Sequence, residues 1–156
     1  MSSVTAAPDK VRHKTFQYRT AVNWTGGRSG RLVAEGRPAL DVSSPPEFKG
    51  EAGRWTPEDL FVAAVDLCTM TTFLFFAERR KLTLLGYESR AEGVLEFVDG
   101  GYRFTRVVLR PRLTLADGAD ESAAAEALGE AHEACLIGRS VSAEVRIEPE
   151  FARPDA

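Results

Sequence analysis

The chain has few of the residues that bind metals or build disulfide frameworks, since its 156 residues include only two cysteines and two histidines. Cys68 and Cys135 lie far apart in the sequence, and a pair of thiols does not complete a zinc site by itself. His132 stands three residues before Cys135, but only His13 and Cys68 could add nitrogen or sulfur ligands. A metal centre is therefore not expected, and the two thiols are either inert core residues or a redox pair.

The chain also lacks an excess of charge of one sign. Its 20 Lys and Arg and 23 Asp and Glu side chains are mixed along the sequence and give a formal net charge of -3. This distribution offers no basic surface for nucleic acid or for an anionic membrane. The apolar fraction of 44% and the charged fraction of 28% are those of an ordinary globular protein.

No long hydrophobic segment is present either. Residues 1–16 contain no apolar stretch of the kind that secretion signals carry. The longest apolar segment, residues 61–77, is interrupted by Asp66 and three threonines, which makes it too short and too polar for a comfortable bilayer span. We expect it to be a core helix of a cytoplasmic protein, where a permanent structural disulfide is not expected.

The periodicity of apolar residues predicts one α+β domain over residues 16–156, preceded by a polar segment, 1–15, that we expect to be flexible. The expected elements are strands 17–24, 31–36 and 39–44, helix 57–81, strands 87–100 and 101–116, helix 119–135 and a strand over 141–151. The inner face of the middle strands should include Val94, Phe97, Phe104, Val107 and Leu109.

The first helix has the strongest local signal. Thr56 is a good N-cap, Pro57 suits the first helical position, and Asp59 completes a capping box. The helix should run for about 24 residues, or roughly 36 Å. Because it is apolar almost all round, we expect other elements to cover it on several sides.

Cys68 lies about three turns inside this helix, where the helix dipole lowers a thiol pKa little. Apolar neighbours would raise that pKa by desolvation, so a reactive Cys68 needs a cation from elsewhere, and arginine suits best. Glu58 is ten residues away, about 15 Å along the axis, and cannot touch the thiol of its own helix. Cooperation between the two would require two antiparallel copies of the helix or a long intermediary, which indicates a dimer.

Four segments carry a family resemblance when they are taken in order. They are TGGRSGR at 25–31, the SPPEF-G loop at 44–50, TPEDLFVAAVDLC at 56–68 and AHEAC at 131–135. Together they resemble the OsmC/Ohr family of thiol-dependent hydroperoxide reductases over nearly the whole chain.

The resemblance implies an intertwined homodimer with long helices at its centre and antiparallel sheets around them. It implies an organic hydroperoxide substrate, Cys68 as the thiol that attacks it, and Cys135 as the thiol that resolves the sulfenic acid to a disulfide. By the same resemblance Arg28 activates the thiolate and Glu58 orients that arginine, both from the other subunit. A dithiol, such as a lipoylated protein, would then reduce the disulfide, and neither a metal nor an organic cofactor is needed.

The sequence also departs from the family pattern. Cys135 is followed by LIGRS, without the Pro-aromatic pair of many members, which leaves turnover and the electron donor open. The 44–55 loop resembles the broader OsmC-like group, and Arg37 or Arg54 could replace Arg28. A second hypothesis is therefore a non-catalytic dimer that binds a small apolar or electrophilic ligand, and a third is a structural dimer with inert thiols.

Several of these residues also have simpler interpretations. Glu58 would complement the helix dipole and Arg28 would be a solvated turn residue. Asp66 should face a dimer seam or pair with an arginine, because a buried unpaired carboxylate is costly. We expect the aromatic residues to be core or dimer contacts rather than a substrate pocket; they are Phe73, Phe75 and Phe76.

Overall fold

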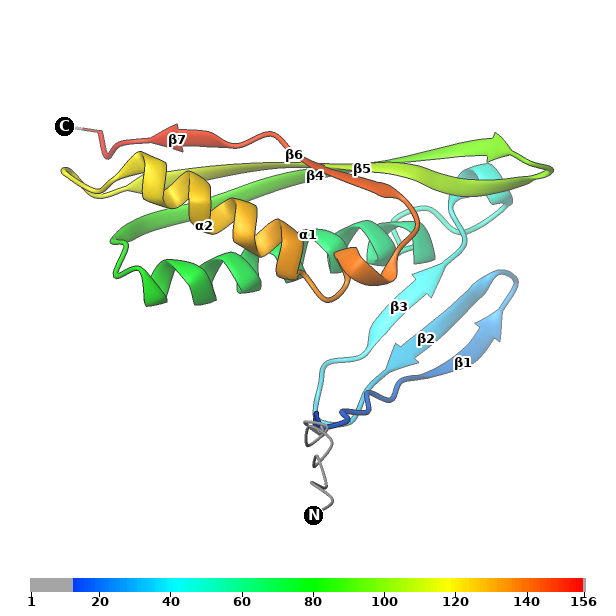
Figure 1. Ribbon diagram of the computed structural model, residues 1–156. Helices are drawn as coiled ribbons and strands as arrows, with labels where there is room; N and C mark the ends of the chain where they lie inside the picture. Colours follow the sequence, from blue (N-terminus) through cyan, green and yellow to red (C-terminus); the bar gives the residue numbers. More distant parts are fainter. Residues whose placement is uncertain (1–12, 156) are drawn as a thin grey trace, which may run out of the picture.

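The computed structural model describes residues 13–155, which form two sheets and two long helices (Figure 1). The strands are β1 Ala21–Gly26, β2 Ser29–Val33, β3 Leu40–Ser43, β4 Leu84–Val98, β5 Gly101–Leu115, β6 Glu144–Ile147 and β7 Glu150–Ala152. The helices are α1 Pro57–Arg79 and α2 Glu121–Ala134, with 3₁₀ turns η1 Pro46–Phe48 and η2 Gly138–Ser140. This order confirms the predicted α+β class; the expected flexible segment, 1–15, lies almost wholly outside the described residues.

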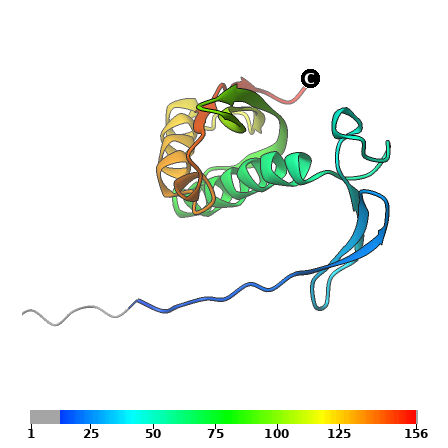
Figure 2. The same ribbon diagram turned by 90° about the vertical axis from the view of Figure 1, so that its right-hand side faces the viewer.

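The first sheet, β1-β2-β3, is antiparallel and projects away from the rest of the chain near the start of α1 (Figures 1 and 2). Gly26 and Gly27, with φ of 123° and 52°, make the turn between β1 and β2, where a side chain would be strained. Trp24 remains 79% exposed and Val22 65% exposed. This small sheet therefore has almost no core of its own within one chain.

The second sheet has the order β4-β5-β6, with β7 also pairing with β5. β4 and β5 form a long antiparallel hairpin that turns at Asp99 and Gly100, both of which have positive φ. β6 and β7 then run parallel to β5. The single final strand that the sequence predicted is divided at Pro149, a residue that cannot donate a backbone hydrogen bond to a ladder.

The predicted inner face is correct for Val107 and Leu109, which are fully buried, and wrong for Phe97, which is 64% exposed. Val94 and Phe97 are three residues apart in β4, so the alternation of a strand points them to opposite faces of the sheet. Phe97 comes two residues before the turn and lies near the hairpin tip, where it packs edge-on against Tyr102 at 5.3 Å between ring centroids.

α1 begins as predicted. The Thr56 hydroxyl accepts a hydrogen bond from the Asp59 N–H at 3.1 Å, and the Thr56 N–H donates to the Asp59 carboxylate at 3.0 Å. The helix ends at Arg79, slightly before the predicted end, because Lys81 adopts a left-handed φ of 53°.

α1 and α2 lie on the same face of the second sheet and pack against each other (Figure 1). Arg80 fastens the pair, since its guanidinium donates to both carboxylate oxygens of Glu130 at 2.9 and 3.0 Å. The larger buried cluster consists of Phe73, Ala77, Leu113, Leu115, Ala124, Ala127, Leu128 and Ala131. A smaller cluster, toward the start of α1, consists of Val65, Val107, Leu109 and Ala143.

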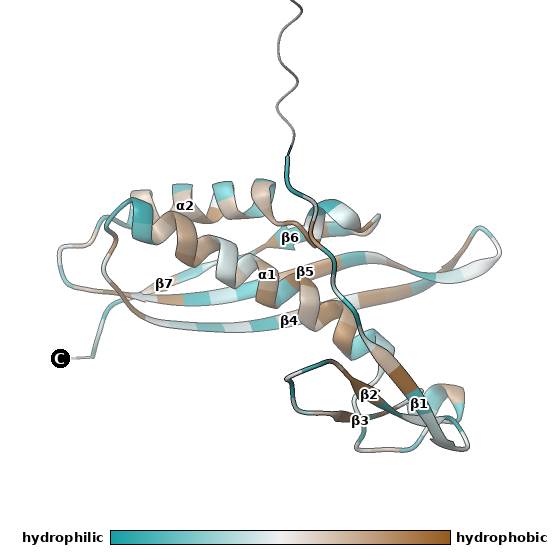
Figure 3. Ribbon diagram, turned by 90° about the horizontal axis from the view of Figure 1, so that it is seen from below, coloured by the Kyte–Doolittle hydropathy of each residue, from teal (hydrophilic) through white to brown (hydrophobic). Residues whose placement is uncertain are grey.

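The opposite face of α1 is uncovered, which corrects the expectation that it would be covered on several sides. Leu67 is 58% exposed, Leu74 40% and Phe75 52%, and Figure 3 shows α1 in front of the second sheet. By length and composition alone α1 could cross a bilayer, which corrects the expectation that this segment is too short and too polar to do so. An exposed apolar face of this kind is typical of surfaces that bind another protein, a ligand or a membrane.

Candidate functional site

The two cysteines, 67 positions apart in sequence, meet where α2 ends against α1. Cys68 lies in the middle of α1, and Cys135 is the C-cap of α2. Each thiol affects the pKa of the other, and both are free thiols. The packing of the two helices therefore brings together the pair that the sequence singled out.

Cys135 is the buried member of the pair, with 2% of its surface exposed. Its sulfur accepts a hydrogen bond from the Gly138 N–H at 3.3 Å and lies 3.8 Å from the Thr69 hydroxyl. Burial is the main cause that raises the pKa of the Cys135 thiol, and the hydrogen bond with Cys68 adds to it. Cys135 is therefore held mainly as the neutral thiol.

Cys68 is partly exposed, and at this thiol the effects that lower the pKa outweigh those that raise it. Burial raises its pKa, but the backbone N–H of Ile137, the Cys135 thiol, the Thr72 hydroxyl and the backbone N–H of Leu136 together lower it below the ordinary thiol value. The Thr72 hydroxyl lies 4.0 Å from the sulfur. Cys68 is therefore the thiol that more readily becomes a thiolate, the form that attacks electrophiles.

The short turn after α2 shapes this site. Cys135 has φ of -59° and ψ of 114°, which takes the chain out of the helix and across α1. Gly138 packs closely there, since a Cβ on it would lie 3.4 Å from the Cys135 sulfur. Leu136 is 71% exposed and Ile137 38%, so the amides that reach Cys68 carry apolar side chains directed to solvent.

Glu58 lies in the first turn of α1, in a groove of about 390 Å³ between α1 and β4 that Trp55 also lines. Its Oε2 atom is buried and has no hydrogen-bond partner among residues 13–155. Glu58 is not among the groups that act on Cys68 of its own chain. The groove therefore holds a carboxylate with an unfilled hydrogen-bonding position.

Asp66 lies farther along the same side of α1 and lines a neighbouring cavity of about 310 Å³. It accepts a hydrogen bond from the Ser89 hydroxyl at 2.6 Å, so its partner within the chain is a serine and not the expected arginine. The hydroxyl of Tyr87, in the same cavity, is buried without a hydrogen-bond partner among the described residues. Burial and then the charge of Asp66 raise the pKa of Tyr87 to about 12.

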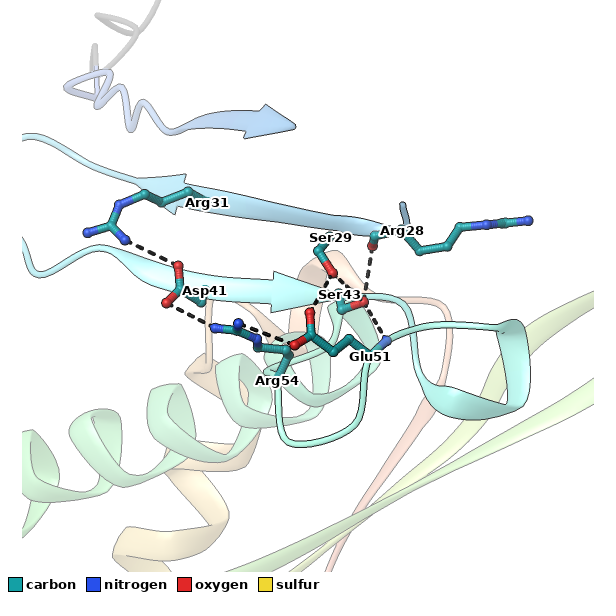
Figure 4. Close-up of polar contacts among 7 residues, drawn as sticks. All are labelled: Arg28, Ser29, Arg31, Asp41, Ser43, Glu51 and Arg54. Atoms are coloured by element: carbon teal, nitrogen blue, oxygen red, sulfur yellow. Dashed lines mark hydrogen bonds and ion pairs between the residues drawn. The ribbon is translucent and has the colours of Figure 1, made fainter. Parts of the chain in front are cut away.

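Arg28 lies in the β1–β2 turn, away from the thiols of its own chain. Its carbonyl accepts hydrogen bonds from the Ser43 hydroxyl at 3.1 Å and the Ser44 N–H at 3.2 Å, which fix the turn. Figure 4 shows the guanidinium directed away from this polar cluster. Within residues 13–155 it makes no ion pair, and it is not among the groups that act on Cys68.

The two alternative arginines have partners of their own. Arg54 forms ion pairs with Asp41 at 3.0 Å and Glu51 at 3.3 Å. Arg37 donates to the carbonyl of Glu35 at 2.7 Å. Of the three candidate arginines, Arg28 is therefore the one whose guanidinium is available to a site outside its own sheet.

Sequence reasoning missed the roles of Thr69, Thr72 and Gly138 around the sulfurs. The signal was present, because threonines one and four positions after Cys68 interrupt an otherwise apolar helix. His132 is exposed and lies in a groove between α2 and β6. No cluster of three potential metal ligands occurs within residues 13–155.

Comparison with known proteins agrees with this fold. YmaD, an uncharacterized protein of Bacillus subtilis (strain 168), is 25% identical over 132 residues, which cover 82% of this chain and 88% of YmaD. The structure of VCA0330, an OsmC-like protein of unknown function from Vibrio cholerae, has a TM-score of 0.81 at 25% identity and covers 86% of this chain and 99% of its own.

A third similar protein is an organic hydroperoxide resistance protein, OsmC, from Legionella pneumophila. Its structure has a TM-score of 0.70 at 23% identity and covers 90% of this chain and 99% of its own. The family described as OsmC-like protein matches residues 50–150, a range that holds both helices, the second sheet and both thiols. With the fold and the matched range in agreement, this chain belongs to the OsmC-like protein family.

Proposed function

We propose that this protein is a thiol-dependent peroxidase that reduces organic hydroperoxides to alcohols. The observation that carries the proposal is a pair of adjacent free thiols with unequal surroundings. Cys68 is partly exposed with a lowered pKa, and Cys135 is buried with a raised pKa. A two-thiol redox cycle needs this difference in pKa and exposure, because one thiol must react with the peroxide and the other must react only with the resulting sulfenic acid.

In the first step the Cys68 thiolate attacks the outer oxygen of the hydroperoxide. An S–O bond forms, the O–O bond breaks, and the alkoxide takes a proton to leave as the alcohol. In the second step the Cys135 thiolate attacks the sulfur of the Cys68 sulfenic acid. An S–S bond forms, the S–O bond breaks, and hydroxide leaves with a proton as water; an external dithiol then reduces the disulfide and is itself oxidised to one.

The active form is a homodimer in which a second copy supplies Arg28 and Glu58 to each Cys68. The uncovered apolar face of α1, the buried carboxylate oxygen of Glu58 without a partner, and the unpaired guanidinium of Arg28 support this arrangement. A guanidinium beside the site would stabilise both the thiolate and the departing alkoxide, and a carboxylate would hold its fork in place.

A direct test adds one equivalent of cumene hydroperoxide to the reduced protein and maps the peptides by mass spectrometry. A Cys68–Cys135 linkage should form, and peroxide consumption in the presence of dithiothreitol should be lost in Cys68→Ser. In Cys135→Ser the first equivalent should still be consumed, leaving a sulfenic acid on Cys68. Absence of the linkage together with an ordinary alkylation rate at Cys68 would refute the peroxidase.

A second candidate function is a dimer that binds a small apolar or electrophilic ligand without turnover. The observation that favours it is the apolar surface next to Cys68, formed by Leu67, Leu136 and Ile137. Under this alternative, the ligand would raise the unfolding temperature and Cys68 would react slowly with peroxide. The same peroxide titration separates the two functions.

A further inference from the structure

Each sulfur of the pair has its own threonine on α1. The Thr72 hydroxyl lies 4.0 Å from the Cys68 sulfur, and the Thr69 hydroxyl lies 3.8 Å from the Cys135 sulfur. Each hydroxyl has one proton and two acceptors, the sulfur and a helix carbonyl: the Thr72 hydroxyl lies 2.7 Å from the Cys68 carbonyl and the Thr69 hydroxyl 2.9 Å from the Val65 carbonyl. A hydroxyl rotates freely enough to turn its single proton from a carbonyl to an anion beside it.

We propose that Thr69 and Thr72 are positioning residues that divide the two steps of the peroxidase cycle. Thr72 steadies the Cys68 thiolate during its attack on the peroxide, and Thr69 steadies the Cys135 thiolate during its attack on the sulfenic sulfur. The inference rests on the proposed function and deepens it by giving each step its own hydroxyl.

Stabilisation of the thiolate by a hydroxyl matters most at Cys135. This sulfur is 2% exposed, and Thr69 is 1% exposed, so bulk water cannot stabilise a charge there. Two donors in the structure face the sulfur, the Gly138 N–H at 3.3 Å and the Thr69 hydroxyl at 3.8 Å. Removing the hydroxyl would leave the thiolate with one donor. When the Thr69 hydroxyl rotates toward the sulfur, the Val65 carbonyl keeps its hydrogen bond within the helix. The rotation therefore costs little free energy.

Cys68 has more support. It is partly exposed, and the N–H groups of Leu136 and Ile137 act on it in addition to Thr72. Loss of the Thr72 hydroxyl should therefore slow the first step a few-fold. Loss of the Thr69 hydroxyl should slow the second step roughly tenfold, the rate equivalent of a modest hydrogen bond to a charged atom.

The experiment compares Thr69→Val and Thr72→Val, which replace a hydroxyl by a methyl group of similar size. The matched control is Thr71→Val, because the Thr71 hydroxyl donates to the Cys68 carbonyl at 3.1 Å and contacts neither sulfur. Reduced protein is mixed with one equivalent of cumene hydroperoxide over a range of pH. Dimedone labelling then follows the sulfenic acid, and maleimide labelling follows the loss of thiols to the disulfide.

Thr69→Val should form sulfenic acid at the wild-type rate and disulfide about tenfold more slowly, with the pH midpoint of disulfide formation shifted upward. Thr72→Val should slow only sulfenic acid formation. Thr69→Ser, which keeps a hydroxyl, should restore both the rate and the pH midpoint of the second step.

Equal rates of both steps in all three valine variants would overturn the inference, as would a Thr69→Ser protein as slow as Thr69→Val. In either case the proposed function stands, because the sulfenic acid and the disulfide still form. If the wild-type protein forms no sulfenic acid on Cys68, both the proposed function and the roles of Thr69 and Thr72 are refuted.

Discussion

Cys68 and Cys135 show how surroundings give two identical side chains different chemistry. Desolvation acts on both thiols and disfavours the charged form. At Cys135 desolvation is the stronger effect, because the sulfur is almost fully enclosed. At Cys68 partial exposure and several hydrogen-bond donors outweigh it. The difference comes from the turn after α2, whose Leu136 and Ile137 amides act on Cys68 while the turn encloses the Cys135 sulfur.

This difference predicts the pH dependence of alkylation. A thiol with a lowered pKa is deprotonated at lower pH, so the iodoacetamide rate of Cys68 should rise through a midpoint below that of the same thiol in the urea-unfolded chain. Cys135→Ser isolates Cys68 for this measurement, and the new hydroxyl keeps a donor at that position. Cys68→Ser serves as the comparison, where Cys135 should show a midpoint above the unfolded value. A Cys68 midpoint equal to or above the unfolded value would contradict the assignment of Cys68 as the attacking thiol.

At the scale of elements, α1 depends on its first turn. Thr56 is 7% exposed, and its hydroxyl and backbone N–H both bond to Asp59. Because the first N–H groups of a helix have no partners within the helix, such caps supply a measurable part of its stability. The cap also fixes the place of Glu58, two residues later.

Thr56→Ala should lower the free energy of unfolding by about 1–2 kcal/mol, the usual range for a lost N-cap. Urea denaturation, followed by circular dichroism, measures this change. Thr56→Ser keeps the hydroxyl and should stay within about 0.5 kcal/mol of the wild type, the range of neutral substitutions. An alanine variant as stable as the wild type would show that the capping box contributes nothing to stability.

Sequence reasoning succeeded for elements where the chemistry is local. The start of α1 and the turn at Gly100 depend on residues that neighbour each other, so their patterns were sufficient. Phe97 was wrongly assigned to the core because it lies at the end of the hairpin, opposite Tyr102, where alternation along the strand does not tell whether another element covers the side chain. Thr69 was missed because its contact with the Cys135 sulfur depends on the packing of α2 on α1. Thr72 follows Cys68 by four residues in the same helix, so its contact could have been predicted from helical spacing.

At the scale of the whole molecule, three features of the single chain bear on the proposed homodimer. The sheet β1-β2-β3 projects from the body, α1 has an open apolar face, and the arginine and glutamate of the proposed site lie away from Cys68 of their own chain (Figure 2). In the proposed homodimer, each of these features of one chain would contact the second chain. These three features support the proposed homodimer.

Mixing two inactive variants tests this exchange. Cys68→Ser and Arg28→Ala, co-expressed with different tags, should form heterodimers in which one site combines an intact Cys68 with an intact Arg28 from the other chain. Peroxide consumption should recover to about half of the wild-type level for each purified heterodimer. Each variant alone should remain inactive as a homodimer. If the heterodimer is also inactive, Arg28 acts within its own chain. If Arg28→Ala is active by itself as a homodimer, Arg28 has no part in the reaction.

The meeting of Cys68 and Cys135 has a mechanical consequence as well. A bond between the two sulfurs would close a ring that contains the end of α1, the whole β4–β5 hairpin and α2. Cross-links that close loops of this size stabilise a fold by on the order of 4 kcal/mol, largely by restricting the unfolded chain. The oxidised protein would therefore have the higher free energy of unfolding. The redox state of the two thiols would then determine how readily the domain unfolds on heating and how readily proteases cleave it.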